Sequence, residues 1–210
     1  GAKLHHNARI EAPIDGLVLK INDEARAFDV VIVAAGGWAR KLLPEFAGKL
    51  AVKRRVVGWF ESPNPRMAPV ICADNDEGVY GMPAPRGLYK LGLHAIGGAS
   101  DPDDVREPDA QDAALLSEQA RVLLPTHNRE PVRMARCLYT VTPDEHFLIT
   151  PSHINERILL FSACSGHGFK FAPMFGAIAE DWLNGKQTEE LTAFGPARRA
   201  NVNRLGGEKT

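Results

Sequence analysis

The stretch 161–171 carries the side chains with the most chemical potential in this sequence. There an apolar strand passes into the turn Ser165-Gly166-His167-Gly168 and continues at Lys170 as the start of a helix. The glycines let the main chain approach a ligand closely, and such a turn presents N–H groups to an anion or a ring edge. His167 supplies a donor that can be neutral, and Lys170 supplies one that stays charged. The pattern is typical of a binding turn and, equally, of a tightly packed corner.

A second strand-to-helix junction lies at 30–43. The apolar run 30–34 enters the turn Gly36-Gly37-Trp38, and a short helix is expected through Leu42 and Leu43. In open α/β sheets ligands gather at the carboxyl ends of such strands, so the junction predicts either a ligand site or a plain turn without a ligand. The fingerprint GxGxxG of a dinucleotide pyrophosphate site does not occur in the sequence.

Composition indicates an ordinary globular protein. The chain has 210 residues, 44% of them hydrophobic and 24% charged, and its formal net charge of -1 makes nucleic acid an unexpected partner. The runs 53–55 (basic) and 101–104 (acidic) are short enough to be interpreted as solvated surface. Three cysteines far apart, without a CxxC pair, argue against a disulfide framework and against a metal site. We expect a cytoplasmic protein, because no run is long and apolar enough for a membrane span and no signal pattern is present.

The elements that must position these residues are mostly strands. Apolar runs and alternation predict strands at 16–22, 28–35, 56–61, 69–73, 78–82, 88–94, 133–141 and 158–163. Helical spacing predicts one helix over 111–124, ending at Pro125, and a second from Pro173 to Gly185 with Met174, Ile178 and Trp182 on one side. We therefore expect an antiparallel sheet in the middle of the chain and a frayed polar tail after about Pro196.

Several motifs in the same order resemble the family of monomeric sarcosine oxidases and N-methyltryptophan oxidases, within the D-amino-acid-oxidase-like flavoproteins. The motifs are AAGGW at 34–38, YGMP at 80–83, YKLGLH at 89–94, CLYT at 137–140, TPDEHF at 142–147 and SGHGFKF at 165–171. The resemblance implies an α/β (α+β) fold that combines part of a Rossmann-like FAD-binding domain with an antiparallel-sheet substrate domain. It implies a remnant of the FAD-binding domain at 1–50, the substrate domain at 51–141, a return to the FAD-binding domain at 142–195 and a tail at 196–210.

The resemblance also implies roles for individual residues. Cys137 matches the cysteine bonded to the 8-methyl carbon of the flavin, although a lone strand cysteine is otherwise most often inert core. Lys90 matches the lysine beside flavin N5 that promotes the reaction with oxygen, an electrostatic task. Lys170 matches the lysine that holds the substrate carboxylate. The aromatic and imidazole groups around the amine and the flavin match His94, Tyr80, Tyr139 and His167, and the cofactor contacts match Ile10, Gly36, Trp38, Gly166 and Gly168.

The activity implied by the resemblance is FAD-dependent oxidation of sarcosine or another N-methyl amino acid. Oxygen would be reduced to hydrogen peroxide, and the imine product would be hydrolysed to an aldehyde and an amine. Two other functions stay open: a related flavin oxidase of glycine, pipecolate or another cyclic amino acid, and a noncatalytic module.

One departure from the family pattern is large. The amino-terminal βαβ unit with its glycine fingerprint, the ribose-binding acid and the arginine that partners Lys170 have no counterpart in these residues. We therefore expect the carboxyl-terminal portion of a longer enzyme, which needs the amino-terminal segment as a partner. By itself this portion is expected to bind FAD poorly and to be inactive.

Overall fold

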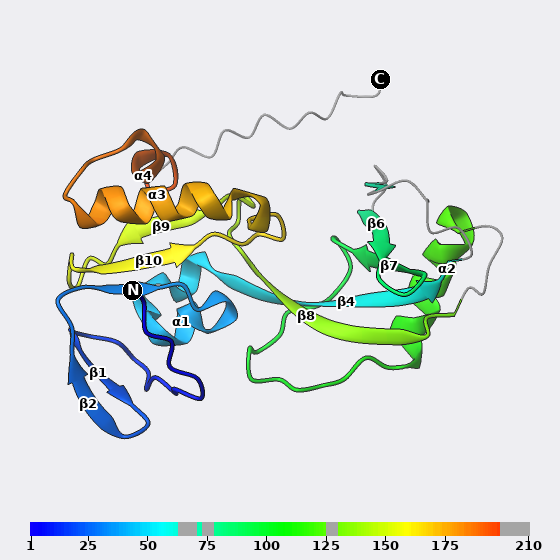
Figure 1. Ribbon diagram of the computed structural model, residues 1–210, viewed down its shortest axis with the longest axis horizontal. Helices are drawn as coiled ribbons and strands as arrows, with labels where there is room; N and C mark the ends of the chain where they lie inside the picture. Colours follow the sequence, from blue (N-terminus) through cyan, green and yellow to red (C-terminus); the bar gives the residue numbers. More distant parts are fainter. Residues whose placement is uncertain (63–70, 73–77, 125–129, 198–210) are drawn as a thin grey trace. The chain divides into compact units, whose positions relative to one another are not determined.

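The structure is a computed structural model that describes residues 1–62, 71–72, 78–124 and 130–197. The chain forms two compact units, of which unit 1 comprises 1–51 and 140–210, and unit 2 comprises 52–139. The chain passes between them twice, inside strands β4 (Ala51–Glu61) and β8 (Arg133–Val141) (Figure 1). The mixed helices and sheets confirm the expected α/β fold class.

Unit 1 is built on a three-stranded sheet in the order β3-β10-β9. Strand β10 (Ile158–Ser162) pairs in parallel with β3 (Val31–Val33) and antiparallel with β9 (Leu148–Pro151). Parallel pairing of β3 with β10 joins segments that are far apart in the sequence, and helical segments cover the sheet (Figure 1). Strand β9 is absent from the sequence predictions above, because its four residues are too short to show a period.

Alternate side chains of this sheet point to opposite faces and pack into two separate apolar cores. Ile158 and Leu160 pack with the short helix α1 (Ala39–Leu42) and the 3-10 turn Pro44–Lys49. Leu159 points to the other side and packs with α3 (Ala172–Leu183) and α4 (Glu189–Ala193). The spacing predicted for α3 is confirmed: Ile178 is buried, and Gly185, with a φ of 72°, follows the last turn.

A hairpin of β1 (Val18–Ile21) and β2 (Glu24–Ala27) also belongs to unit 1. Its two turn residues, Asn22 and Asp23, have positive φ values of 49° and 70°, which suits the turn that right-twisted strands favour. The predicted strand at 16–22 is therefore confirmed, whereas β2 is exposed throughout and has no apolar alternation from which it could be predicted.

Unit 2 is a five-stranded sheet in the order β5-β6-β7-β4-β8, packed against helix α2 (Ala110–Leu123). Strand β5 is Ile71–Cys72, β6 is Val79–Ala84 and β7 is Leu88–Leu93, and the inner strands are β6, β7 and β4. Asp109 caps the helix with a capping box. Its carboxylate accepts from the N–H groups of Gln111 and Asp112, and the Asp112 carboxylate accepts from the N–H of Asp109. The expected antiparallel sheet and helix in the middle of the chain are confirmed; residues 69–70 and 73, Pro125 and the tail from 198 lie outside the described residues.

Two sequence predictions are wrong. The run 28–35 forms a strand only at Val31–Val33, so the predicted length is wrong. Val30 and Ile32 are 39% and 38% exposed, at the strand that lies at the end of the three-stranded sheet. The basic run 53–55 is not solvated surface: Arg54 and Arg55 are 6% and 4% exposed. Both arginines lie inside β4, where alternate positions enter the two faces of a sheet.

Candidate functional site

One face of the unit 2 sheet, opposite α2, carries aromatic and cationic side chains. Residues paired across neighbouring strands point to the same side of a sheet. Lys90 of β7 pairs with Trp59 of β4 and with Met82 of β6, so these three side chains share a face. One step further along the same face, Gly92 pairs with Tyr80. Phe60, Leu91 and their neighbours point the other way and pack against α2.

Strand β8 adds its odd-numbered residues to the same face. The guanidinium of Arg133 lies 4.6 Å from the centre of the Trp59 ring, which places 133, 135, 137 and 139 on Trp59's side of the sheet. We call this surface the site face. The site face includes Arg55, Val57, Trp59, Tyr80, Met82, Lys90, Gly92, His94, Arg133, Cys137 and Tyr139. Of the residues expected in the site, the fold thus brings together Tyr80, Lys90, His94, Cys137 and Tyr139.

Three rings on the site face form one hydrogen-bonded cluster. The Tyr139 hydroxyl lies 3.0 Å from Nδ1 of His94. The His94 ring packs on Tyr80 with a centroid distance of 4.5 Å. Gly92 makes room for this packing, because a Cβ there would come within 2.4 Å of the Tyr80 ring. The absence of a side chain at 92 is therefore a requirement of the cluster.

The electrostatics of the cluster keep both phenols protonated. Burial raises the pKa of Tyr139, and the nearby Tyr80 and Cys137 raise it further, while the Arg55 guanidinium opposes them. Burial likewise raises the pKa of Tyr80, partly offset by its hydrogen bond with Tyr139. The two hydroxyls therefore act near neutral pH as hydrogen-bonding groups rather than as bases. Cys137 lies two residues before Tyr139 on β8 and therefore on the same face, and ionisation of its thiol would raise the pKa of both phenols.

Lys90 has a defined neighbour on the site face. Its ammonium lies 5.8 Å from the centre of the Trp59 ring, on the residue directly paired with it across β4 and β7. A cation over an indole face is attracted by the ring quadrupole, which restrains the otherwise flexible side chain. Lys90 is half-buried and Trp59 is half-buried, so the contact is partly protected from water.

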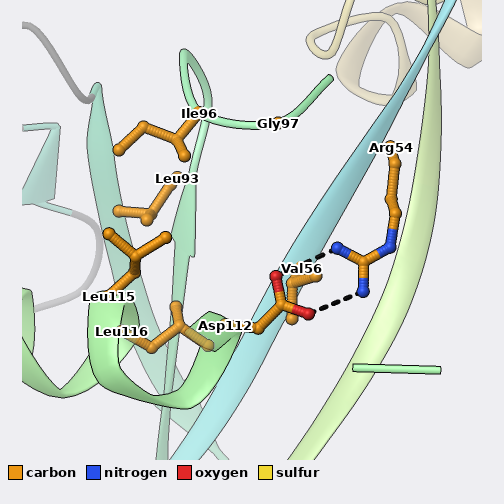
Figure 2. Close-up of a pocket in the computed structure, with 8 residues that line it drawn as sticks. All are labelled: Arg54, Val56, Leu93, Ile96, Gly97, Asp112, Leu115 and Leu116. Carbon is orange, nitrogen blue, oxygen red and sulfur yellow. Dashed lines mark hydrogen bonds and ion pairs between the residues drawn. The ribbon is translucent and has the colours of Figure 1, made fainter. Parts of the chain in front are cut away.

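A small pocket on the opposite face of the sheet has a structural role. It lies between α2 and the strands β4 and β7, and its lining is mostly aliphatic (Figure 2). Figure 2 shows the Asp112 carboxylate facing the Arg54 guanidinium, and the two Nη atoms lie 3.0 and 2.6 Å from its oxygens. This hydrogen-bonded pair lowers the pKa of Asp112 and raises that of Arg54. The residues lining the pocket are Arg54, Val56, Leu93, Ile96, Gly97, Asp112, Leu115 and Leu116.

In unit 1 the turn 165–168 has the geometry of a packed corner. The N–H groups of His167 and Gly168 both donate to the Cys164 carbonyl, at 2.9 and 3.1 Å, so these two amides are used inside the turn. A Cβ at Gly168 would lie 1.8 Å from the Ala163 carbonyl oxygen, and Gly166 has a φ of 81°. Close main-chain packing thus requires glycine at 168, and the left-handed backbone favours glycine at 166.

The side chains that follow this corner are exposed. The His167 ring contacts Phe147, with centroids 4.9 Å apart, and its Nε2 donates to the Glu145 carbonyl at 3.0 Å when it carries the proton. Lys170 lies in the 3-10 turn Phe169–Phe171, with its ammonium 5.3 Å from the Phe171 ring centre. Lys170 therefore presents a charge on unit 1, while Lys90 and Cys137 belong to unit 2.

The other expected cofactor contacts also lie in unit 1. Gly36 has a φ of 52° and begins the 3-10 turn Gly36–Trp38 directly after β3. Trp38 is 44% exposed, whereas Ile10 bridges to Ile21 and packs against the core that holds α1. The turn at the carboxyl end of β3, beside its parallel partner β10, is the place where open α/β sheets bind ligands.

The candidates that the sequence predicted lack three residues of the site face: Arg55, Trp59 and Arg133. Arg55 lies inside the basic run that was interpreted as surface, and Trp59 was taken only as part of a strand. Their alternate spacing with Val57 along β4 was the available signal, because residues two apart share a face.

Within residues 1–62, 71–72, 78–124 and 130–197, no cluster of three or more His, Cys, Asp or Glu side chains is arranged to hold a metal ion. None of the helices described there has the length and apolar character needed to cross a membrane.

Comparisons with known proteins point in one direction. The family described as FAD dependent oxidoreductase, DAO, matches residues 1–182. Monomeric sarcosine oxidase from Bacillus sp. (strain B-0618) is 32% identical over 217 residues, which cover 95% of this chain and 55% of the relative. N-methyl-L-tryptophan oxidase from Salmonella dublin is 30% identical over 192 residues, covering 86% and 50%. The chain thus spans about half the length of the curated relatives it matches.

Solved structures show the same fold. An open form of NikD, described as an unusual amino acid oxidase, superposes with a TM-score of 0.70 at 22% identity, over 90% of this chain and 53% of that chain. Glycine oxidase from Geobacillus kaustophilus superposes with a TM-score of 0.71 at 22% identity, over 90% and 51%.

Proposed function

This chain belongs to the DAO family of FAD-dependent oxidoreductases, and we propose that it supplies the amine-oxidising site of an enzyme acting on sarcosine or another N-methyl amino acid. The substrate C–N bond would lose two electrons and two protons to give an imine, which water hydrolyses to an aldehyde and an amine. Oxygen would take up the electrons and protons as hydrogen peroxide. The observation that carries the proposal is the site face, where a thiol, an ammonium group and a phenol–imidazole cluster share one side of a sheet.

The residues present fit FAD. Lys90 and Arg133 place two cations on the site face, which suits an electron-rich ring, and Cys137 lies on the same face as Tyr80 and Tyr139. Bound FAD supplies the acceptor for the electrons of the C–N bond and the means of passing them to oxygen. Cys137 would hold the ring covalently, and the remaining cofactor contacts would come from Ile10, Gly36, Trp38, Gly166, His167 and Gly168.

The chain's own side chains would divide the remaining work. Lys90, restrained by Trp59, would supply a fixed positive charge for the reaction with oxygen. The hydroxyl of Tyr139 and the ring of His94 would orient the substrate amine, and the Tyr80 ring would hold the His94 ring in place by packing on it. Lys170, an exposed ammonium group in unit 1, would hold the substrate carboxylate through a charge-assisted contact.

The experiment is a comparison of Lys90→Met with Lys186→Met in the FAD-loaded protein that carries this chain. Lys186 is the matched control, since its ammonium is exposed and pairs with Asp181 at 2.8 Å in unit 1. We expect Lys90→Met to slow the reaction with oxygen on the order of a hundredfold while substrate oxidation persists. Equal losses in both half-reactions would refute the role of Lys90.

A substrate panel and an acid precipitation test the other parts of the proposal. Peroxide release should be fastest with N-methyl amino acids; a preference for glycine or a cyclic amino acid would reassign the substrate within the same family. Flavin that stays in the acid pellet, and is lost in Cys137→Ala, would establish the covalent bond. No peroxide with any amine would favour a noncatalytic module.

A further inference from the structure

Arg55 is a buried cation whose surroundings are shaped around it. It is 4% exposed, and its Nη1 donates to the carbonyl of Arg54 at 3.1 Å and to that of Gly97 at 3.0 Å. Gly97 has a φ of 131°, and a Cβ there would lie 1.9 Å from the Arg54 carbonyl oxygen and 2.9 Å from Arg55 Nη1. Only glycine allows the loop to approach the guanidinium this closely.

The same guanidinium contacts the phenol–imidazole cluster. Its Cζ lies 5.2 Å from the centre of the Tyr139 ring, within the range of a cation–π contact. The Tyr139 hydroxyl in turn lies 3.0 Å from Nδ1 of His94. Gly97 follows His94 by three residues, so Arg55 contacts the Tyr139 ring on β8 and also the loop that continues from His94.

We propose that Arg55 is a positioning residue, which fixes the ring of Tyr139 against His94 by clamping the loop at Gly97 to strand β8. A buried charge costs desolvation, and an apolar side chain of similar volume in such a place is often neutral or stabilising. Two carbonyl bonds and a stacked ring offset that cost here and hold the cluster in one arrangement. The consequence for catalysis rests on the proposed function, whereas the positioning itself does not.

Three tyrosines in the chain make the proposal measurable without activity. Tyr80, Tyr89 and Tyr139 are the tyrosines of this sequence, so the protein that carries this chain is labelled with 3-fluorotyrosine and their fluorine resonances are assigned by single Tyr→Phe variants. Tyr89 is 1% exposed and packs in the core with α2, on the other side of the sheet, and serves as an internal reference. The variants are Arg55→Met, Arg55→Lys and the control Arg133→Met, which removes another cation stacked on a site-face ring.

We expect Arg55→Met to shift and broaden the Tyr139 resonance and to leave that of Tyr89 unchanged. Arg55→Lys keeps the charge but loses the planar fork, so it should shift the Tyr139 resonance by a smaller amount; it also serves if the methionine variant does not fold. Arg133→Met should leave the Tyr139 resonance in place. An unchanged Tyr139 resonance in a folded Arg55 variant, or an equal shift of Tyr89, would overturn the proposal.

Kinetics then separate the two proposals. If amine oxidation occurs, Arg55→Met should raise the KM for the amine by tenfold or more, with the reaction with oxygen unchanged, and Arg55→Lys should restore part of the loss. An unchanged KM would overturn the link between Arg55 and catalysis. If the parent oxidises no amine, the proposed function fails, and the fluorine spectra still decide whether Arg55 positions Tyr139.

Discussion

Removal of Arg54 should destabilise unit 2, because it leaves the carboxylate of Asp112 without its buried partner. The Arg54 and Asp112 side chains are 7% and 16% exposed, and the pair joins β4 to the first turn of α2. Breaking a buried pair from one side leaves an uncompensated charge, which costs roughly 3–5 kcal/mol. Because Asp112 retains some exposure and still accepts from the N–H of Asp109, we expect the lower end, about 3 kcal/mol, for Arg54→Met.

The double variant Arg54→Met/Asp112→Leu removes both charges and should recover most of that loss. It still lacks the return bond of the capping box, so it should remain about 1 kcal/mol below the parent. Urea unfolding followed by circular dichroism would measure Arg54→Met, Asp112→Leu and the double variant, and from them the coupling between the two positions. Lys186→Met, which breaks an exposed pair, should leave the midpoint unchanged. If Arg54→Met lowers the free energy of unfolding by less than about 1 kcal/mol, or if the double variant is less stable than Arg54→Met, the role of the ion pair is refuted.

The same pair predicts a dependence on pH. Arg54 lowers the pKa of Asp112 in the folded state. The stabilisation is therefore complete above the pKa of an aspartate in the unfolded chain, 3.8, and is lost as the pH falls through the lower pKa of the folded state. Unfolding midpoints measured between neutral pH and strongly acidic pH should drop more for the parent than for Asp112→Asn. Parallel curves for the two proteins would contradict this assignment.

Three further changes test the geometry. Gly92→Ala places a Cβ against the ring of Tyr80 and should lower stability by roughly 1–3 kcal/mol in thermal melts. Gly98→Ala, whose Cβ would meet nothing within 4 Å, should leave stability unchanged. Gly168→Ala should lower stability at least as much, because its Cβ would lie 1.8 Å from a carbonyl oxygen. Gly176→Ala in α3 should instead raise stability by up to about 1 kcal/mol. Equal melting temperatures for these two variants would contradict the structure. Asp109→Ala should cost about 1 kcal/mol in urea, and no loss would argue against the cap.

Much of the fold could be predicted because its signals are local. The strand at 133–141 and the helices α2 and α3 follow from apolar patterning, helical spacing and the stop signals at Pro125 and Gly185. Strand β2 and strand β9 could not be predicted in this way, since one is polar throughout and the other is too short to show a period. The run 28–35 was predicted too long because an apolar run by itself does not reveal that a strand lies at the end of a sheet.

The site divides along the same line. The residue types and order of motifs by themselves determined the family, the candidate thiol at Cys137 and the candidate cations Lys90 and Lys170, since these depend only on which side chains occur and in what sequence. Only tertiary structure decided that Arg55 is buried. Its burial depends on the pairing of β4 and on a contact with Gly97, which lies 42 residues away. Periodicity is a property of neighbouring residues, whereas strand pairing and loop contacts join distant ones. The sequence of the run 53–55 therefore predicts surface, and only the distant partners show that Arg54 and Arg55 are buried.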